Sequence, residues 1–133
     1  MQLPDRDAAF LTERGFDWEL VADPNGSVAV IIHELDVGGG GFAPERTDLM
    51  IRIPPQYPMT PLDMWYCDPP VRVAATGQFA TATEVMETHV GRTWQRFSRH
   101  LPGTWRPAAD GLRSFLVLIQ RELQGVGQER SGA

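Results

Sequence analysis

The sequence predicts a single α+β domain in which helices pack on one face of an antiparallel sheet. Three observations carry this prediction. Apolar residues recur at helical spacing near both ends of the chain, segments with alternating apolar and polar residues lie between them, and 133 residues with 42% hydrophobic content suffice for one core. We expect the domain to cover residues 1–124 and residues 125–133 to form a flexible tail.

The first predicted elements are a short helix and a strand. Pro4 followed by Asp5 and Asp7 is typical of a helix N-terminus, and Gly15 ends the apolar pattern that follows. Residues 16–22 then alternate apolar and acidic side chains, which is the period of a half-buried strand.

Three more strands complete a predicted four-stranded antiparallel meander. The second strand covers residues 28–35, after a turn at residues 23–26. The third covers residues 48–53 and stops at residues 54–55, two prolines that cannot donate to a ladder. The fourth is short and covers residues 64–67.

Four consecutive glycines, Gly38 to Gly41, follow the second strand. They lack the strand-to-helix context and the Lys-Ser/Thr ending of a phosphate-binding loop. We therefore interpret them as a flexible hairpin loop and not as a nucleotide site.

The C-terminal half contains an irregular segment and a clear helix. Residues 71–97 have weak periodicity, and residues 83–90 are a candidate short helix. Asp110 is a candidate N-cap for the last helix. The helix carries one apolar stripe, which we assign to the core: Leu112, Phe115, Leu116, Ile119 and Leu123.

Composition excludes several classes of function. The net charge of -5 argues against general nucleic-acid affinity, although residues 1–66 (11 acids, 4 arginines) are far more acidic than residues 67–133 (6 acids, 8 arginines). No apolar run approaches the roughly 18 residues of a membrane-spanning helix, so we expect a soluble, cytoplasmic protein. All 12 basic residues are arginine, which excludes lysine nucleophiles.

Metal and disulfide chemistry also lack support. Cys67 is the single cysteine of the chain, so no internal disulfide is expected. His33, His89 and His100 form no cluster at ligand spacing. We expect no metal and no other cofactor.

Two motifs carry a resemblance to a known family. Residues 53–62, IPPQYPMTPL, resemble the apolar-Pro-x-x-Tyr-Pro-x-x-Pro-Pro signature that follows the third strand of ubiquitin-conjugating (UBC-fold) enzymes, with Leu62 in place of the last proline. Residues 105–110, WRPAAD, resemble the family's Trp-x-Pro-Ala-x-Thr motif before the helix that follows the active site. We interpret the shared positions as scaffold: Pro54, Tyr57, Pro58, Pro61, Trp105, Pro107 and Asp110.

The segments at residues 94–100 and 105–107 also resemble those of a bacterial UBC-like group, prokaryotic family E. Such proteins are associated with ubiquitin-like proteins, activating enzymes and deconjugating peptidases, in some cases in antiphage defence. The resemblance therefore implies two partners, a ubiquitin-like protein and the activating enzyme of the same pathway.

The chain departs from the family where a conjugating enzyme carries its chemistry. The His-Pro-Asn motif is missing, and counting back about eight residues from Trp105, where the family places its cysteine, leads to Phe97 and Ser98. The single asparagine, Asn25, lies far from this segment. A thioester at the usual position is therefore excluded.

Three hypotheses remain open, and with them the question whether the chain is an enzyme. In one, Ser98 accepts the acyl group as an oxyester, with His100 or His89 as the base and nearby arginines steadying the oxyanion. In another, Cys67 is the nucleophile. In the third, which we place first, the domain is catalytically silent and binds its partners through Arg92, Trp94, Arg96, Arg99 and Arg106.

Overall fold

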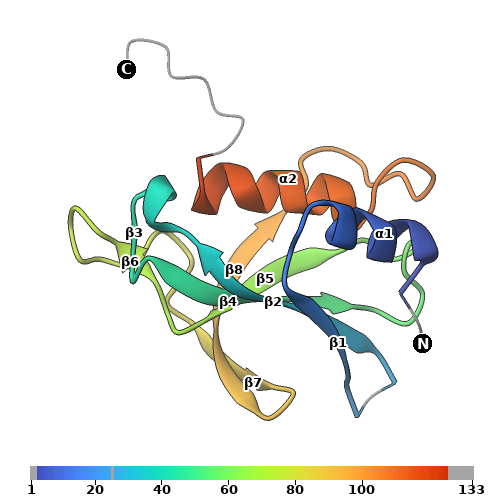
Figure 1. The fold of residues 1–133 in the computed structure, drawn as a ribbon, viewed down its shortest axis with the longest axis horizontal. Coiled ribbons are helices and arrows are strands. Elements are labelled where there is room, and N and C mark those ends of the chain that lie inside the picture. Colours follow the sequence, from blue (N-terminus) through green and yellow to red (C-terminus); the bar gives the residue numbers. More distant parts are fainter. Residues whose placement is uncertain (1–2, 25, 126–133) are drawn as a thin grey trace.

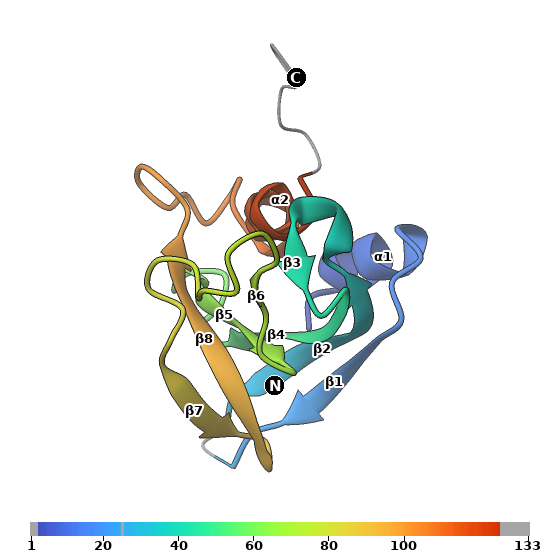
Figure 2. The same ribbon diagram turned by 90° about the vertical axis from the view of Figure 1, so that its left-hand side faces the viewer.

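The computed structural model describes residues 3–24 and 26–125. Within these ranges two α helices, α1 (Asp5–Glu13) and α2 (Leu112–Leu123), lie on one face of a curled antiparallel sheet (Figures 1 and 2). The predicted α+β class is confirmed. No helix in the described part of the chain has the length and apolar character needed to cross a membrane.

The main sheet has six strands among the described residues, in the order β1-β2-β4-β5-β8-β7. Their bounds are β1 (Trp18–Ala22), β2 (Val28–Asp36), β4 (Arg46–Ile53), β5 (Asp63–Asp68), β7 (Met86–His89) and β8 (Arg92–His100). A small two-stranded sheet pairs β3 (Phe42–Ala43) with β6 (Arg72–Val73).

The sheet is larger than the predicted four-stranded meander. The strands β1, β2, β4 and β5 pair in succession as expected, but β8 and β7 extend the sheet beyond β5. The helix predicted over residues 83–90 is wrong, because β7 pairs there with β8. Val90 and Gly91, with φ values of 46° and 77°, form the two-residue turn between them. Two central residues with positive φ suit the twist of a tight hairpin.

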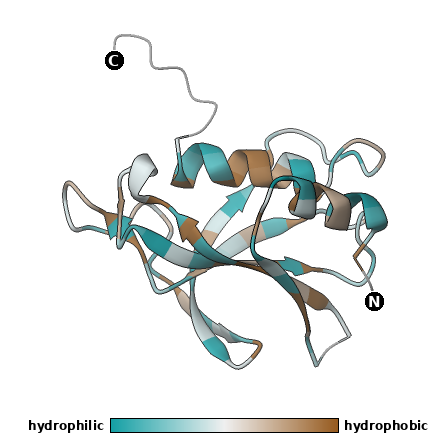
Figure 3. Cartoon of the chain, viewed as in Figure 1, coloured by the Kyte–Doolittle hydropathy of each residue, from teal (hydrophilic) through white to brown (hydrophobic). Residues whose placement is uncertain are grey.

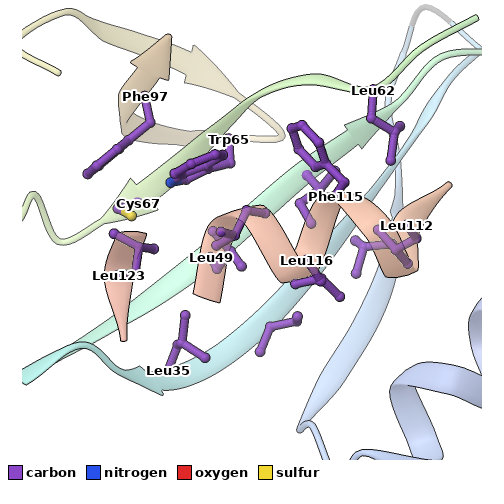
Figure 4. Close-up of a cluster of buried hydrophobic side chains, with 14 of the residues drawn as sticks. Leu35, Leu49, Leu62, Trp65, Cys67, Phe97, Leu112, Phe115, Leu116 and Leu123 are labelled. Atoms are coloured by element: carbon purple, nitrogen blue, oxygen red, sulfur yellow. The ribbon is translucent and has the colours of Figure 1, made fainter. Parts of the chain in front are cut away.

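The main core lies between the sheet and α2. The five residues of the predicted apolar stripe on α2 are all at most 1% exposed, which confirms their assignment to the core. Figure 4 shows this stripe packed on side chains of the sheet, including Leu49, Trp65 and Phe97. Figure 3 shows alternating hydrophobic and hydrophilic bands along both helices, as an amphipathic helix requires.

A second, smaller core lies on the opposite face of the sheet. Its buried members come from four strands: Ala29, Ile31, Met50, Tyr66 and Trp94. Because side chains alternate along a strand, these residues point away from α2. We call this side the open face of the sheet.

The glycine-rich segment is packed and is not the expected flexible loop. Gly38–Gly40 forms a single 3-10 turn that lies against the end of α2. A Cβ atom on Gly40 would overlap the backbone carbonyl of Leu123, so only glycine fits there. Gln124 Nε2 also donates to the carbonyl of Asp36 at 2.8 Å.

The N-terminus of α2 is capped differently from the prediction. Asp110 accepts a hydrogen bond from the Arg106 N–H (2.9 Å), so it closes the preceding turn and does not cap the helix. Gly111 is the N-cap, and its N–H donates to Ser114 Oγ at 3.0 Å. The next N–H, that of Leu112, donates to the Tyr57 hydroxyl at 2.7 Å.

Two expectations fall partly outside the described residues. The predicted turn at residues 23–26 includes Asn25, and the predicted tail includes residues 126–133.

Candidate functional site

The two motifs of the resemblance meet in space. Trp105 Nε1 donates to the carbonyl of Pro58 at 2.8 Å, which ties the loop before α2 to the proline-rich turn. Tyr57 donates to Asp7 Oδ2 of α1 at 2.7 Å. Burial raises the pKa of Tyr57 most, this hydrogen bond raises it further, and the pKa lies well above its usual range. The motif residues therefore join α1, the turn and α2.

Ser98 and His100 lie at the end of β8 that leads into the Trp105 loop. The pairing of β5 with β8 shifts register between Asp63 and Trp65, opposite residues 97–100, so the regular alternation of faces is interrupted at Ser98 and His100. Ser98 is half-buried and its N–H donates to the carbonyl of Ala82, while its hydroxyl makes no hydrogen bond within the described residues. The structure places Ser98 and His100 two residues apart at the end of β8, without a hydrogen bond between them.

A surface hollow of about 300 Å³ lies beside His100. Its walls come from the end of the proline-rich turn and from the loop after β8: Pro61, Leu62, Asp63, Leu101, Gly103 and Trp105. Asp63 and His100 are also cross-strand partners. An imidazole and a carboxylate thus stand at the rim of a largely apolar hollow, near the position where the family carries its nucleophile.

His89, the second candidate base, is far from Ser98. It pairs with Arg92 at the other end of β8, and Ser98 lies six positions further along the strand, roughly 20 Å at 3.3 Å per residue. His89 Nε2 lies 2.8 Å from Glu87 Oε1. The hypothesis that His89 activates Ser98 is wrong.

The arginines of β8 do not form one patch. Arg92 contacts Asp48 (3.0 Å) and Asp68 (2.9 Å) on the open face, and Arg96 contacts Glu87 at 2.7 Å. Burial by itself would raise the pKa of Asp48, but hydrogen bonds from the Glu34 N–H and from Arg92 outweigh it and lower that pKa.

The remaining predicted contact residues lie elsewhere. Arg99 lies on the helix side of the sheet and pairs with Glu122 of α2 at 2.7 Å. Arg106 is exposed in the Trp105 loop. Trp94, expected as a surface anchor, is fully buried, and its indole N–H donates to the carbonyl of His89. It is a core residue because the curled sheet closes over it.

Cys67 lies in the main core between the sheet and α2 (Figure 4). It is fully buried, and this burial strongly raises the pKa of the thiol. A protonated thiol without access to solvent is a poor nucleophile, so the structure contradicts the hypothesis of a catalytic Cys67.

The sequence did not predict the carboxylates that organise the open face. Asp48, Asp68 and Glu87 each bind an arginine of β8. The alternation of polar and apolar residues along a strand indicates which face each carboxylate occupies. It does not indicate the arginine that the carboxylate binds, because that arginine lies on another strand. Among the described residues, no group of three or more His, Cys, Asp or Glu side chains is placed to hold a metal ion.

The comparison with protein families decides the assignment. The family described as prokaryotic E2 family E matches residues 3–126. The chain belongs to this family. The resemblance inferred from the two motifs is thereby confirmed, and this member of prokaryotic E2 family E is in general terms a UBC-like component of protein conjugation. No curated protein and no solved structure matches it.

Proposed function

We propose that this chain acts in the bacterial cytoplasm as a catalytically silent UBC-like component of a ubiquitin-like conjugation pathway. It binds the ubiquitin-like protein, its activating enzyme, or both, and carries no acyl group itself. Antiphage defence is the setting that the resemblance implies for such a pathway.

The burial of Cys67 is the observation that carries this proposal. A thioester carrier needs a thiolate that the activating enzyme can reach, and the single thiol of the chain is fully buried with a raised pKa. Ser98 stands near the usual nucleophile position, but the described residues offer its hydroxyl no hydrogen-bonded base. A serine hydroxyl without such a base is a weak nucleophile.

A second candidate function is supported by the hollow beside His100. Here Ser98 Oγ attacks the activated C-terminal carbonyl of the ubiquitin-like protein and forms an ester bond. The bond from that carbonyl to AMP or to the thiol of the activating enzyme breaks, and the proton of the hydroxyl passes to His100. Ser98 and His100 are two residues apart on β8, and this candidate requires their side chains to rotate until the hydroxyl reaches the imidazole.

Intact-mass spectrometry separates the two candidates. The full chain is mixed with the activating enzyme, the ubiquitin-like protein and ATP, and complex formation is followed in parallel by size-exclusion chromatography. A complex with unchanged chain mass is the expected result. An added mass equal to that of the ubiquitin-like protein less one water would overturn the catalytically silent assignment. A failure of both partners to bind would overturn the proposed binding role.

The chemistry of any adduct would identify the acceptor. An oxyester on Ser98 resists thiol reductants, hydrolyses in mild base, disappears in Ser98→Ala and persists in Cys67→Ala. If His100 is its base, His100→Ala slows its formation by roughly 100-fold. Ser98→Cys should then give an adduct that thiols remove, because a thiolate replaces the hydroxyl at the same position.

Arg106 is the predicted contact residue best placed to meet a partner. It is exposed and has no ion pair within the described residues, whereas Arg92, Arg96 and Arg99 already bind carboxylates. We expect Arg106→Glu to weaken the complex, more strongly at low salt. Arg72→Glu, the same charge change at an exposed position of β6, is the matched control. If the two variants bind the partner with equal affinity, Arg106 is not part of the interface.

A further inference from the structure

His33 lies on β2 between carboxylates of two neighbouring strands. Its Nε2 atom is 3.0 Å from Glu19 Oε2 on β1, and its Nδ1 atom is 3.4 Å from Asp48 Oδ2 on β4. Both ring nitrogens carry a hydrogen only when the imidazole is protonated. The geometry therefore favours the imidazolium form.

This position coincides with an irregularity of the sheet. The pairing of β2 with β4 shifts register between Ile32 and Leu35, and Glu34 has a φ of 54°. The Glu34 N–H donates to Asp48 Oδ1 at 3.0 Å, and the His33 N–H donates to the carbonyl of Asp17 at 2.7 Å. The start of edge strand β1 is thus attached to the sheet through both the backbone and the side chain of His33.

The charges around His33 indicate that loss of its proton affects the contact with β1 more than the contact with β4. Asp48 has a second cationic partner, Arg92 of β8, which also binds Asp68 of β5. For Glu19, His33 is the ion-pair partner within the described residues. On the strand of His33 itself, the carbonyl of Glu34 accepts from Arg46 of β4. Loss of the His33 proton therefore leaves Asp48 its ion pair with Arg92 but removes the positive charge that faces Glu19.

We propose that His33 is a proton-dependent latch that holds edge strand β1 on the sheet. Protonated, it bridges Glu19 and Asp48; neutral, it donates to one of them only. Val21 of β1 packs on the second core, so a loosened β1 uncovers part of that apolar cluster. This device is independent of whether the chain carries an acyl group.

The direction of the pH effect follows from linkage. The hydrogen bond to Glu19 raises the pKa of His33 above its ordinary value of 6.5, and partial burial opposes this. A raised pKa means that the stabilisation is fully present below the pKa of the unfolded chain and is lost as the pH rises through the pKa of the folded protein. We therefore expect β1 to loosen under mildly alkaline conditions.

Hydrogen exchange measured by NMR on the full chain tests the latch. Protection factors of β1 amides are compared with those of β4 amides at about pH 5.5 and about pH 8.5, on either side of the usual histidine range. The ratio of β1 to β4 protection should fall severalfold at the higher pH. His33→Gln should remove this pH dependence, and His100→Gln, at an exposed position, should keep it.

Two outcomes would overturn the proposal: a ratio that does not change with pH in the unmodified chain, or a pH dependence that persists in His33→Gln. If His33→Gln does not fold, Glu19→Gln replaces it, because it removes the carboxylate and keeps the shape. The His33 ring signals must then titrate at a lower pH in Glu19→Gln than in the unmodified chain. Identical titration of the His33 ring in Glu19→Gln and in the unmodified chain would also overturn the proposal.

Discussion

Tyr57 and Asp7, fifty residues apart in the chain, are joined by a 2.7 Å hydrogen bond in the buried centre of the domain. The same hydroxyl accepts from the Leu112 N–H at 2.7 Å. One side chain of the proline-rich turn thus holds the first helix and caps the last. The tyrosine of the family-like motif thus contacts both helices of the scaffold.

Removal of the Tyr57 hydroxyl should destabilise the domain without creating a large cavity. Tyr57→Phe leaves Asp7 and the Leu112 N–H without their partner, which we expect to cost about 1–3 kcal/mol of unfolding free energy. Tyr57→Ala should cost more, about 3–5 kcal/mol, because the ring is lost as well. Urea denaturation measures both.

Trp105→Phe is the matched control for Tyr57→Phe. It removes the hydrogen bond to the Pro58 carbonyl and part of a ring system that packs on the core, and should cost about 1–2 kcal/mol. A loss below roughly 0.5 kcal/mol for both Tyr57→Phe and Trp105→Phe, a value typical of surface changes, would contradict this view of the motif.

Arg92 is expected to neutralise two carboxylates that face each other across neighbouring strands. Asp48 and Asp68 are register partners on β4 and β5, and both contact Arg92. Like charges directly opposite each other destabilise a sheet. Since all three side chains are partly exposed, Arg92→Met should cost about 1–2 kcal/mol near neutral pH.

The same variant should change acid denaturation. The lowered pKa of Asp48 means that its stabilisation is present above the pKa of the unfolded chain and is lost as the pH falls through the folded value. Without Arg92 the pKa of Asp48 rises, so unfolding should begin at a higher pH. Circular dichroism during acid titration measures this shift. An unchanged midpoint pH of unfolding would contradict the stabilising role of Arg92 between Asp48 and Asp68.

Cys67 should react with thiol reagents only when the domain opens. Its burial and raised pKa predict negligible labelling by a chromogenic disulfide reagent in the native state and rapid labelling in guanidinium chloride. Rapid labelling under native conditions would show that the core around Cys67 is accessible, and would revive the thioester hypothesis.

Gly40 should be the least replaceable glycine of its turn. An added Cβ overlaps the carbonyl of Leu123, so Gly40→Ala must shift the turn away from α2, at a cost of about 1–3 kcal/mol. At Gly39 the nearest atom to an added Cβ is the Gln124 carbonyl at 3.8 Å, an ordinary contact. Gly39→Ala should therefore stay within about 0.5 kcal/mol of the unmodified chain. Equal losses of unfolding free energy would refute the packing argument.

The sequence by itself determined the elements whose residues interact locally or repeat regularly. The apolar stripe of α2 and the alternation of the first strands follow from fixed helical and strand periods, so these elements were predictable. The family followed from two motifs because each has fixed composition and spacing. The absence of a cysteine about eight residues before Trp105 was also evident, since it is read directly from the sequence.

Tertiary structure decided which side chains meet. The hairpin of β7 and β8 depends on cross-strand pairing and on Val90 in a left-handed conformation, which a weakly periodic sequence does not reveal. Trp94 looked like a surface anchor, but the curled sheet buries it. Likewise, the partners of Arg92 and His33 come from separate strands. Their charges are paired by the register of the sheet, and register is set by the whole fold and not by any local segment.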